Sequence, residues 1–263
     1  MNLERFTGMC EYDGCYFVTT FNAVLVIEKE TARLVSVYSQ PSFNDLHYCL
    51  AYEKAQVVVN TGLECLEIFD RQWKQTGRIV FDNERDIDGR DWRHVYSTKP
   101  HKYHLNRAFM LQDDLWCTRC LTQDAVKVED ASTKIEIDAG MPHDGLVYDG
   151  CVFFTTTNGC IISYRATDIN DPGTVLQLKN VMPTSDFAWA RGLHITTDNM
   201  FVGSSKFRST KSDEFISRLR KLHSNTSNSA VIQLSRGLNK IIARFETPDP
   251  EAAIFSILSL NTD

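Results

Sequence analysis

The stretch Pro142–Asp168, PHDGLVYDGCVFFTTTNGCIISYRATD, gives the clearest indication of the fold. It contains short runs of Val, Ile, Phe, Tyr and Thr, which are typical of strands. Two dipeptides that favour tight hairpin turns, Asp149-Gly150 and Asn158-Gly159, separate these runs. The stretch therefore predicts three successive antiparallel strands. Few windows elsewhere show the hydrophobic period of about 3.6 residues that marks a helix, so we expect an all-β chain.

The same three-strand plan recurs along the chain. It is found in Phe6–Glu28, Asn44–Asp70, His104–Asp130 and Trp189–Ser235. A fourth, outer strand follows each triplet, at Arg33–Tyr38, Gly77–Phe81, Lys134–Asp138, Thr174–Leu178 and Lys240–Phe245. Four-stranded units that repeat every 40–50 residues or so are typical of a β-propeller. The sequence predicts a single five-bladed β-propeller domain over residues 1–263, with six blades as the alternative.

Two segments exceed this period and are interpreted as insertions, at about 82–102 and 209–228. The C-terminal stretch Ala252–Leu260 is one strand more than five complete blades need. We expect it to join the first blade and to close the ring together with the N-terminal strand, because closure removes exposed strand edges.

Composition and charge narrow the function classes. The chain is 43% hydrophobic and 24% charged, which excludes a disordered or collagen-like protein. Its net charge of −6, with no basic block, argues against nucleic acid and membrane partners. No apolar stretch reaches the length of a membrane span or a signal peptide, so a cytoplasmic location is expected. The eight cysteines fall singly in strand-like runs, as buried core thiols do.

Propeller geometry converts the repeat into a prediction about a site. The first strand of each blade begins at the face to which the second strand returns, so the residues at these ends converge on one central pocket. These positions are rich in polar and ionisable side chains, which favours a binding or catalytic site. Polar residues at strand ends also cap backbone groups, so a structural role is the alternative for each of them. The candidates are Asn44, His47, Asn60, His104, Asn106, His143, Asp144, Asn158, Trp189, Arg191, Lys206 and Arg208.

Several ordered segments among these candidates resemble a known family. They are His104-Leu-Asn106, Met141-Pro-His143, Arg191-Gly-Leu193, Val202–Arg208 and Ile254-Phe255, with Asn44–His47 as a looser match. Together they are similar to a widespread bacterial family of conserved hypothetical proteins, a domain of unknown function expected to be a propeller. The resemblance covers about the last two thirds of the chain. It implies the propeller fold and a site at these residues, and it implies no particular reaction.

One interpretation of the site is metal-assisted catalysis. His47, His104 and His143 come from three blades and could present three imidazoles to one divalent metal ion, leaving a position open for water or substrate. The chain has no HxH or HExxH motif that would fix such a site on one element. Histidines that hydrogen-bond to adjacent loops are the alternative.

A second interpretation needs no metal. Arg191, Lys206 and Arg208 could bind the negative charge of a small anionic metabolite, and Asn44, Asn60, Asn158 and Trp189 could complete the substrate contacts. His104 and His143 would then be acid–base groups, oriented by Asn106 and Asp144. Surface salt bridges without function are the alternative for the cationic residues.

The resulting functional hypothesis is an enzyme of small-molecule metabolism that acts on a polar anionic substrate. The reaction would be of the lyase, isomerase or hydrolase type. The chain has no GxSxG elbow, Walker loop or GxGxxG motif, so none of the standard signatures supports this hypothesis. A noncatalytic ligand-binding or protein-scaffold propeller is the alternative. Substrate, metal and oligomeric state stay open.

Overall fold

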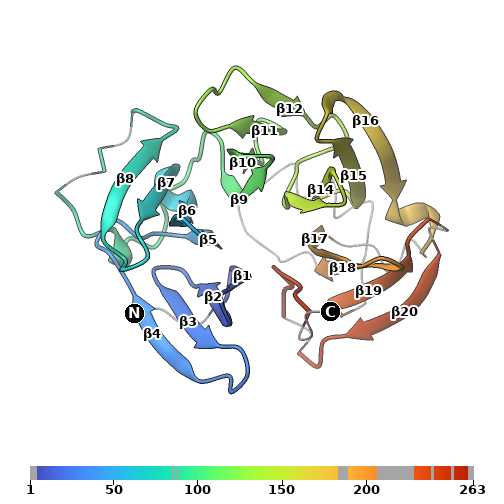
Figure 1. Ribbon diagram of the computed structural model, residues 1–263, viewed down its shortest axis with the longest axis horizontal. Coiled ribbons are helices and arrows are strands. Elements are labelled where there is room, and N and C mark those ends of the chain that lie inside the picture. Colours follow the sequence, from blue (N-terminus) through green and yellow to red (C-terminus); the bar gives the residue numbers. More distant parts are fainter. Residues whose placement is uncertain are drawn as a thin grey trace. The chain divides into compact units, whose positions relative to one another are not determined.

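The computed structural model describes residues 5–84, 86–87, 89–182, 189–205, 228–237, 240–249 and 252–259. Its strands form five antiparallel sheets of four strands each, and every sheet is built from consecutive strands (Figure 1). The fold class is therefore an all-β, five-bladed β-propeller, as the sequence predicts.

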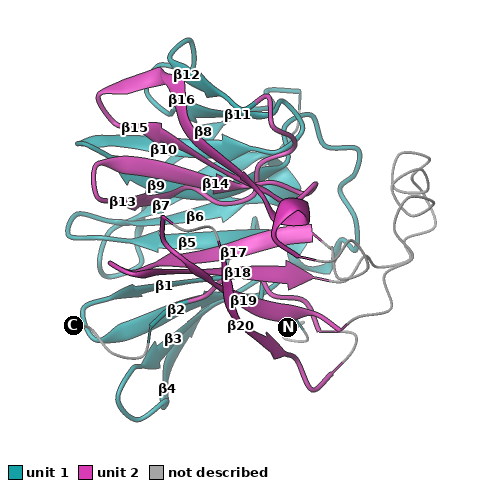
Figure 2. Cartoon of the chain, turned by 90° about the vertical axis from the view of Figure 1, so that its right-hand side faces the viewer, with its two compact units in different colours: residues 1–137, 258–263 teal, residues 138–257 magenta. Residues whose placement is uncertain are grey.

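The chain divides into two compact units, residues 1–137 with 258–263 and residues 138–257 (Figure 2). The first unit holds three sheets. Their strands are β1 (Gly8–Tyr12), β2 (Cys15–Thr19), β3 (Val24–Glu28) and β4 (Leu34–Tyr38); β5 (Leu46–Ala51), β6 (Gln56–Asn60), β7 (Cys65–Phe69) and β8 (Gln75–Val80); and β9 (Leu105–Leu111), β10 (Asp114–Arg119), β11 (Asp124–Lys127) and β12 (Lys134–Glu136).

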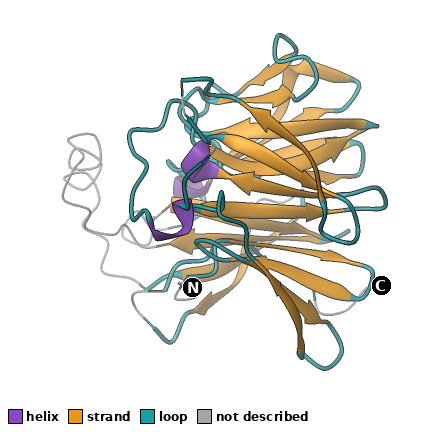
Figure 3. Ribbon diagram, turned by 90° about the vertical axis from the view of Figure 1, so that its left-hand side faces the viewer, coloured by secondary structure: helices purple, strands orange, loops and turns teal. Residues whose placement is uncertain are grey.

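The second unit holds the other two sheets. Their strands are β13 (Leu146–Tyr148), β14 (Cys151–Thr155), β15 (Cys160–Arg165) and β16 (Asp168–Gln177); and β17 (Trp189–Ile195), β18 (Asn199–Ser205), β19 (Ala230–Ser235) and β20 (Ile241–Glu246). Within the described residues, the helical elements are three short 3-10 turns, η1 (Thr61–Leu63), η2 (Trp92–His94) and η3 (Leu178–Asn180) (Figure 3). In this described part of the chain, no helix is long and apolar enough to cross a membrane.

The hairpin turns have the backbone that their sequences favour. Asp149 and Gly150 have φ values of 50° and 70°, and Asp13 and Gly14 have nearly the same pair, 52° and 70°. Positive φ at both central residues gives the turn a twist that matches the flanking strands, which explains the preference for Asp-Gly. The predicted positions of these two turns are confirmed.

Each unit has its own apolar core. All five residues of β6 are buried, including Val57, Val58 and Val59, because sheets cover both faces of this strand. Phe43 and Phe69 meet edge to face nearby, with ring centroids 5.8 Å apart. The second unit packs a separate cluster of aliphatic residues from β17, β18 and β19, among them Leu193, Val202, Ile232 and Leu234.

The predicted C-terminal strand is wrong for the described residues 252–259, which contain no strand. The physical reason is that five complete four-stranded sheets already come from consecutive strands and leave no place for another. The segment is held instead by side chains. The Ser205 hydroxyl accepts a hydrogen bond from the Ile254 N–H (2.9 Å) and donates one to the Ile254 carbonyl (3.2 Å). The Ser229 hydroxyl donates to the Ala252 carbonyl (2.7 Å).

The first predicted insertion, 82–102, folds onto its own unit. Its η2 turn is fastened by a hydrogen bond from the Trp92 N–H to the Pro41 carbonyl (2.6 Å), and the Trp92 indole N–H donates to the Ile87 carbonyl (2.9 Å). The side chain of Asn22 donates to the Arg93 carbonyl (3.1 Å). Of the second insertion, 209–228, all but residue 228 lies outside the described residues.

Candidate functional site

Two residues that precede first strands in the first unit have unusual backbone conformations. Asp45, before β5, has a φ of 47°, and His104, before β9, has a φ of 54°. Asp and His tolerate this left-handed region better than most residues, yet it is still strained. The two strands pack against each other, so the residues at their starts lie in one neighbourhood. We call Asp45, His47, His101, His104 and Asn106 the histidine cluster.

His47 is held at both of its ring nitrogens. Its Nδ1 lies 2.9 Å from Oδ1 of Asn106, and its Nε2 lies 3.6 Å from Oδ1 of Asp45. The amide N–H of Asn106 is used by the Cys120 sulfur, so its oxygen faces the ring and accepts the hydrogen of His47 Nδ1. The orientation of this imidazole is therefore fixed between an amide and a carboxylate. Asp45 retains about a third of its side-chain exposure, 30%, so this pair is open to solvent on the carboxylate side.

His104 contacts two other histidines. Its Nδ1 lies 2.9 Å from Nδ1 of His101, and the two rings are stacked, with centroids 5.2 Å apart. The ring of His47 meets it edge-on, with centroids 4.9 Å apart and an interplanar angle of 85°. Three imidazoles thus share one half-buried neighbourhood.

A buried carboxylate holds the backbone of this cluster. Glu64 follows η1, has a φ of 51° and is fully buried. Its Oε2 accepts the N–H of Lys102 (2.8 Å), and its Oε1 accepts those of Tyr103 (2.7 Å) and His104 (2.5 Å). Three charge-assisted hydrogen bonds fix the chain just where it enters β9, and so fix the position of His104.

The surroundings of His104 and Asp45 shift the pKa values of both groups. Burial is the main reason that the pKa of His104 lies well below its usual value, and the charges of His47 and His101 lower it further. Burial alone would raise the pKa of the Asp45 carboxyl, but the hydrogen bond from His47 and the histidine charges around it bring this pKa well below its usual range. At neutral pH the cluster therefore combines a neutral imidazole, His104, with an ionised carboxylate, Asp45.

The predicted metal site does not find support in this geometry. In the ranges that the structure describes, no group of three or more His, Cys, Asp or Glu residues is arranged to hold a metal ion. His47 and His104 belong to the first unit and His143 to the second. Metal binding by His47, His104 and His143 stays a prediction.

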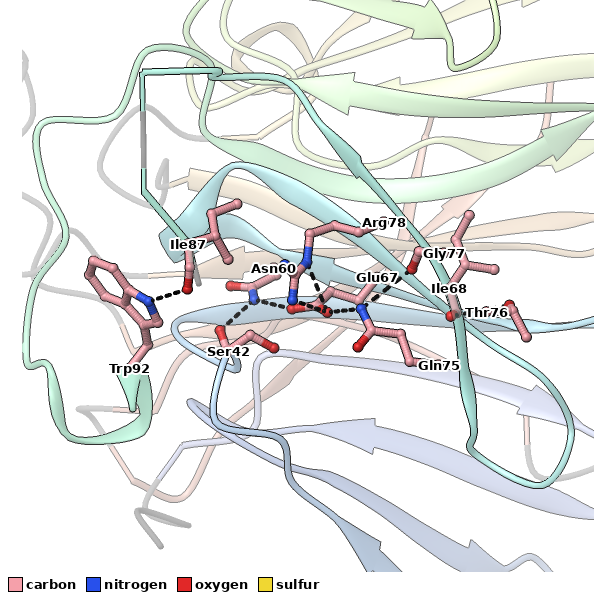
Figure 4. Close-up of polar contacts among 10 residues, drawn as sticks. All are labelled: Ser42, Asn60, Glu67, Ile68, Gln75, Thr76, Gly77, Arg78, Ile87 and Trp92. Atoms are coloured by element: carbon pink, nitrogen blue, oxygen red, sulfur yellow. Dashed lines mark hydrogen bonds and ion pairs between the residues drawn. The ribbon is translucent and has the colours of Figure 1, made fainter. Parts of the chain in front are cut away.

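The side chain of Asn60 makes its hydrogen bonds in the protein interior. It is fully buried, and its amide donates to the Ser42 carbonyl (2.7 Å) and to Oε1 of Glu67 (3.0 Å) (Figure 4). Glu67 is also fully buried, and its other oxygen accepts from Gln75 (2.8 Å) and from Arg78 (3.3 Å). Asn60 is thus part of a polar network within the second sheet that neutralises a buried carboxylate.

Asn44 is likewise fully buried. Its amide donates to the carbonyls of Trp92 and Val95, both at 2.7 Å, and so anchors the 82–102 insertion. Both of its amide hydrogens are used in this way. The substrate-binding roles predicted for Asn44 and Asn60 stay predictions, and the contacts of both side chains are those of structural anchors.

The second unit gathers another group of predicted residues. The guanidinium of Arg191 lies 3.7 Å from the ring centroid of Phe255 and 5.7 Å from that of Trp189. The ring of His143 lies 6.5 Å from the same Phe255 ring. The side chain of Asp144, 1% exposed, accepts hydrogen bonds from the Thr155 hydroxyl and from the N–H of residue 192 (2.9 Å). Arg191 and His143 therefore lie near Phe255 of the C-terminal segment, Trp189 lies beside Arg191, and Asp144 holds the backbone next to Arg191.

The remaining predicted residues divide into two groups. Asn158 lies in an exposed turn, where its oxygen accepts from the Thr156 hydroxyl (2.6 Å) and its amide donates to the Ala139 carbonyl (2.8 Å). Lys206 and Arg208 lie outside the described residues. The catalytic and substrate-binding roles assigned to the second unit from the sequence stay predictions.

Sequence reasoning missed His101 and Glu64. A signal for the first exists, because His101 and His104 are separated by two residues in the run His101-Lys-Tyr-His104. Glu64 has no comparable signal, since one acidic residue before a strand is indistinguishable from a solvent-exposed one. Only the fold brings its carboxylate to the backbone of residues 102–104.

Comparison with known proteins supports the fold. No protein-family model and no curated protein matches the chain. Among solved structures, it is similar to a chain of a nidogen/laminin complex, with a TM-score of 0.62, 10% identity, and coverage of 95% of this chain and 83% of that one.

Two further solved structures bear names of enzymes. Virginiamycin B lyase from Staphylococcus aureus gives a TM-score of 0.58 at 12% identity, covering 95% of this chain and 73% of that one. A putative 6-phosphogluconolactonase from Bacteroides uniformis gives 0.57 at 9% identity, covering 92% and 71%. The resemblance to a bacterial family of conserved hypothetical proteins stays a prediction. At such low identity, what this chain shares with the three solved structures is their fold.

Proposed function

We propose that this chain is an enzyme acting on a small, polar, anionic molecule by histidine acid–base chemistry at the histidine cluster. The observation that carries the proposal is the pair of contacts that fixes His47 between Asp45 and Asn106 beside the half-buried ring of His104. Imidazoles that are held in a fixed orientation next to a carboxylate are typical of general acid–base sites.

The separation of protonation states supports this chemistry. A carboxylate that stays ionised beside an imidazole that stays neutral gives one site both an anion and an uncharged ring that can form hydrogen bonds to a polar substrate. The positive charge of Lys99 also acts on His104, so a cation stands near the cluster to attract an anionic substrate.

A lyase or a hydrolase reaction is the class that fits best. Both reactions need a proton removed at one atom and delivered at another, which paired imidazoles can do. Among the solved structures that share the fold, one is named as a lyase and another as a putative lactonase. These names agree with the proposed class, and the proposal itself rests on the histidine cluster.

The test uses the full chain and begins with 6-phosphogluconolactone, an anionic lactone, followed by a panel of phosphorylated and carboxylated metabolites analysed by mass spectrometry. Once a substrate is converted, His104→Gln should lower kcat by about 10²–10⁴-fold, the range for loss of one acid–base group. His94→Gln is the matched control, because His94 lies in the 82–102 insertion, outside the histidine cluster, with 76% of its side chain exposed.

Unchanged turnover in His104→Gln would contradict the proposal. Ligand binding without conversion by any member of the panel would favour the noncatalytic ligand-binding propeller instead.

A further inference from the structure

Thr98, His101 and His104 form a chain of hydrogen bonds that leads from the insertion to the cluster. The Thr98 hydroxyl lies 3.0 Å from Nε2 of His101, and Nδ1 of His101 lies 2.9 Å from Nδ1 of His104. The backbone at the end of this chain is fixed by Glu64, so these three side chains meet in a defined geometry. Each ring in the chain has one nitrogen turned toward its neighbour.

Only one hydrogen can lie between the two Nδ1 atoms. In a neutral imidazole one nitrogen carries a hydrogen and the other accepts one, so one of these rings donates and the other accepts. The choice is coupled through His101: if its Nδ1 donates to His104, its Nε2 must accept from Thr98, and if its Nδ1 accepts, its Nε2 must donate to Thr98. The proton on His104 is therefore decided two hydrogen bonds away.

The threonine hydroxyl selects one of these arrangements. A hydroxyl has one hydrogen to donate, and in the part of the chain that the structure describes, His101 is the hydrogen-bond partner of the Thr98 hydroxyl. Donation from Thr98 to His101 Nε2 uses that hydrogen within the protein, whereas in the reverse arrangement no acceptor for it lies in the described part of the chain. The favoured order is Thr98 O–H to His101 Nε2, then His101 Nδ1–H to His104 Nδ1.

We infer that His101 is a positioning residue that places the proton of His104 on Nε2. This nitrogen has no hydrogen-bond partner within the described ranges, so it is the atom that His104 can offer to a ligand. His104 then presents an N–H donor, which suits a developing negative charge or a departing oxygen. The inference deepens the proposed function and rests on it for its meaning, because it assigns to His104 the role of a neutral hydrogen-bond donor to the substrate at that site.

The test reads the tautomer directly and needs no substrate. The full chain, labelled with ¹⁵N-histidine, is examined near neutral pH by long-range proton–nitrogen correlation NMR, which separates protonated from bare ring nitrogens. His104→Gln assigns the signals of residue 104. In the unaltered chain we expect Nε2 of His104 to be protonated and Nδ1 to be bare.

Two variants of His101 separate positioning from mere packing. His101→Phe keeps a ring but offers no hydrogen bond, and it should shift His104 to a mixture of both tautomers. His101→Asn can still donate from an amide close to the place of Nδ1, and it should restore the Nε2–H form. Thr98→Val, which removes only the hydroxyl, should also loosen the preference. His94→Phe, in the exposed part of the same insertion, should leave the His104 signals unchanged.

A protonated Nδ1 of His104 in the unaltered chain, or an unchanged tautomer in His101→Phe, overturns the inference. The proposed function fails separately, by the absence of turnover, so a correct tautomer in a chain that converts no substrate would refute the proposed reaction and leave the proton placement standing.

Discussion

The replacement of Glu64 by glutamine should test whether a buried carboxylate holds the histidine cluster together. The change is nearly isosteric, so it alters charge and hydrogen-bonding capacity without opening a cavity. In the folded chain Glu64 is fully buried and accepts the N–H groups of Lys102, Tyr103 and His104 at 2.8, 2.7 and 2.5 Å.

The size of the effect follows from these three contacts. In Glu64→Gln the remaining oxygen can still accept from Tyr103 and His104, but as a neutral group it makes hydrogen bonds about half as strong. The new amide group faces the N–H of Lys102, donor against donor, and leaves that buried group unpaired at a cost of about 1–3 kcal/mol. Together we expect the free energy of unfolding to fall by about 3–5 kcal/mol, a large part of the 5–15 kcal/mol or so that is usual for a folded protein.

The assay is urea unfolding followed by tryptophan fluorescence and circular dichroism. A genuine loss of stability moves the midpoint and leaves the slope m unchanged. The control is Glu84→Gln, a glutamate in the exposed part of the 82–102 insertion, which should stay within about 0.5 kcal/mol of the unaltered chain. If Glu64→Gln stays within the same limit, the three backbone hydrogen bonds do not hold the cluster and the reasoning is refuted.

Three further outcomes are expected. Ser205→Ala removes both hydrogen bonds to Ile254, so hydrogen exchange at that amide should accelerate about 10–100-fold; unchanged protection would mean that other contacts hold the C-terminal segment. Iodoacetamide on the native chain should label Cys15 and Cys151, which are partly exposed, before the six buried cysteines, some of whose pKa values burial raises to about 12 or beyond; peptide mass spectrometry would show a contrary order. Burial also lowers the pKa of His194 below 6.5, so on acidification the unfolded chain binds a proton at His194 before the folded chain does. The free energy of unfolding should therefore decline as the pH falls through 6.5. In His194→Gln this decline should be shallower, and an equal decline would exclude His194 as the cause.

The fold could be predicted because the signals that set it are local. Asp13-Gly14 and Asp149-Gly150 favour a turn whose positive φ values are a property of the dipeptide itself. A strand such as β6, whose residues are all buried, is marked by its run of valines. The Ala252–Leu260 prediction failed for the opposite reason. An apolar run indicates burial, but whether it is buried as a strand depends on a free sheet edge, and every blade already has its four strands.

The candidate site could be predicted only in part, because strand ends indicate where a side chain starts and not what it meets. His104 and Asn106 do lie beside His47, because β5 and β9 are neighbouring first strands, while the roles predicted for them stay predictions. Asn44 was taken from the same kind of position, yet its amide is used by the backbone of the insertion. An amide side chain fits a ligand and a loop equally well, and only the folded insertion decides between them.

The residues of the histidine cluster come from the starts of strands and from the 82–102 insertion, and these two kinds of element differ in how well they tolerate substitutions. Asp45 and His47 stand at the start of β5, the first strand of its sheet, which pairs with β6. Thr98 and His101 stand on the insertion, which is held by hydrogen bonds from single side chains and by the backbone hydrogen bond from Trp92 to Pro41. A loop can be altered in sequence with less effect on the core than a strand, so the part of the site that sets the proton on His104 is also the part that can change most freely. Chemistry on this scaffold would therefore be tuned through the insertion, while the carboxylate–imidazole pair on the sheet stays constant.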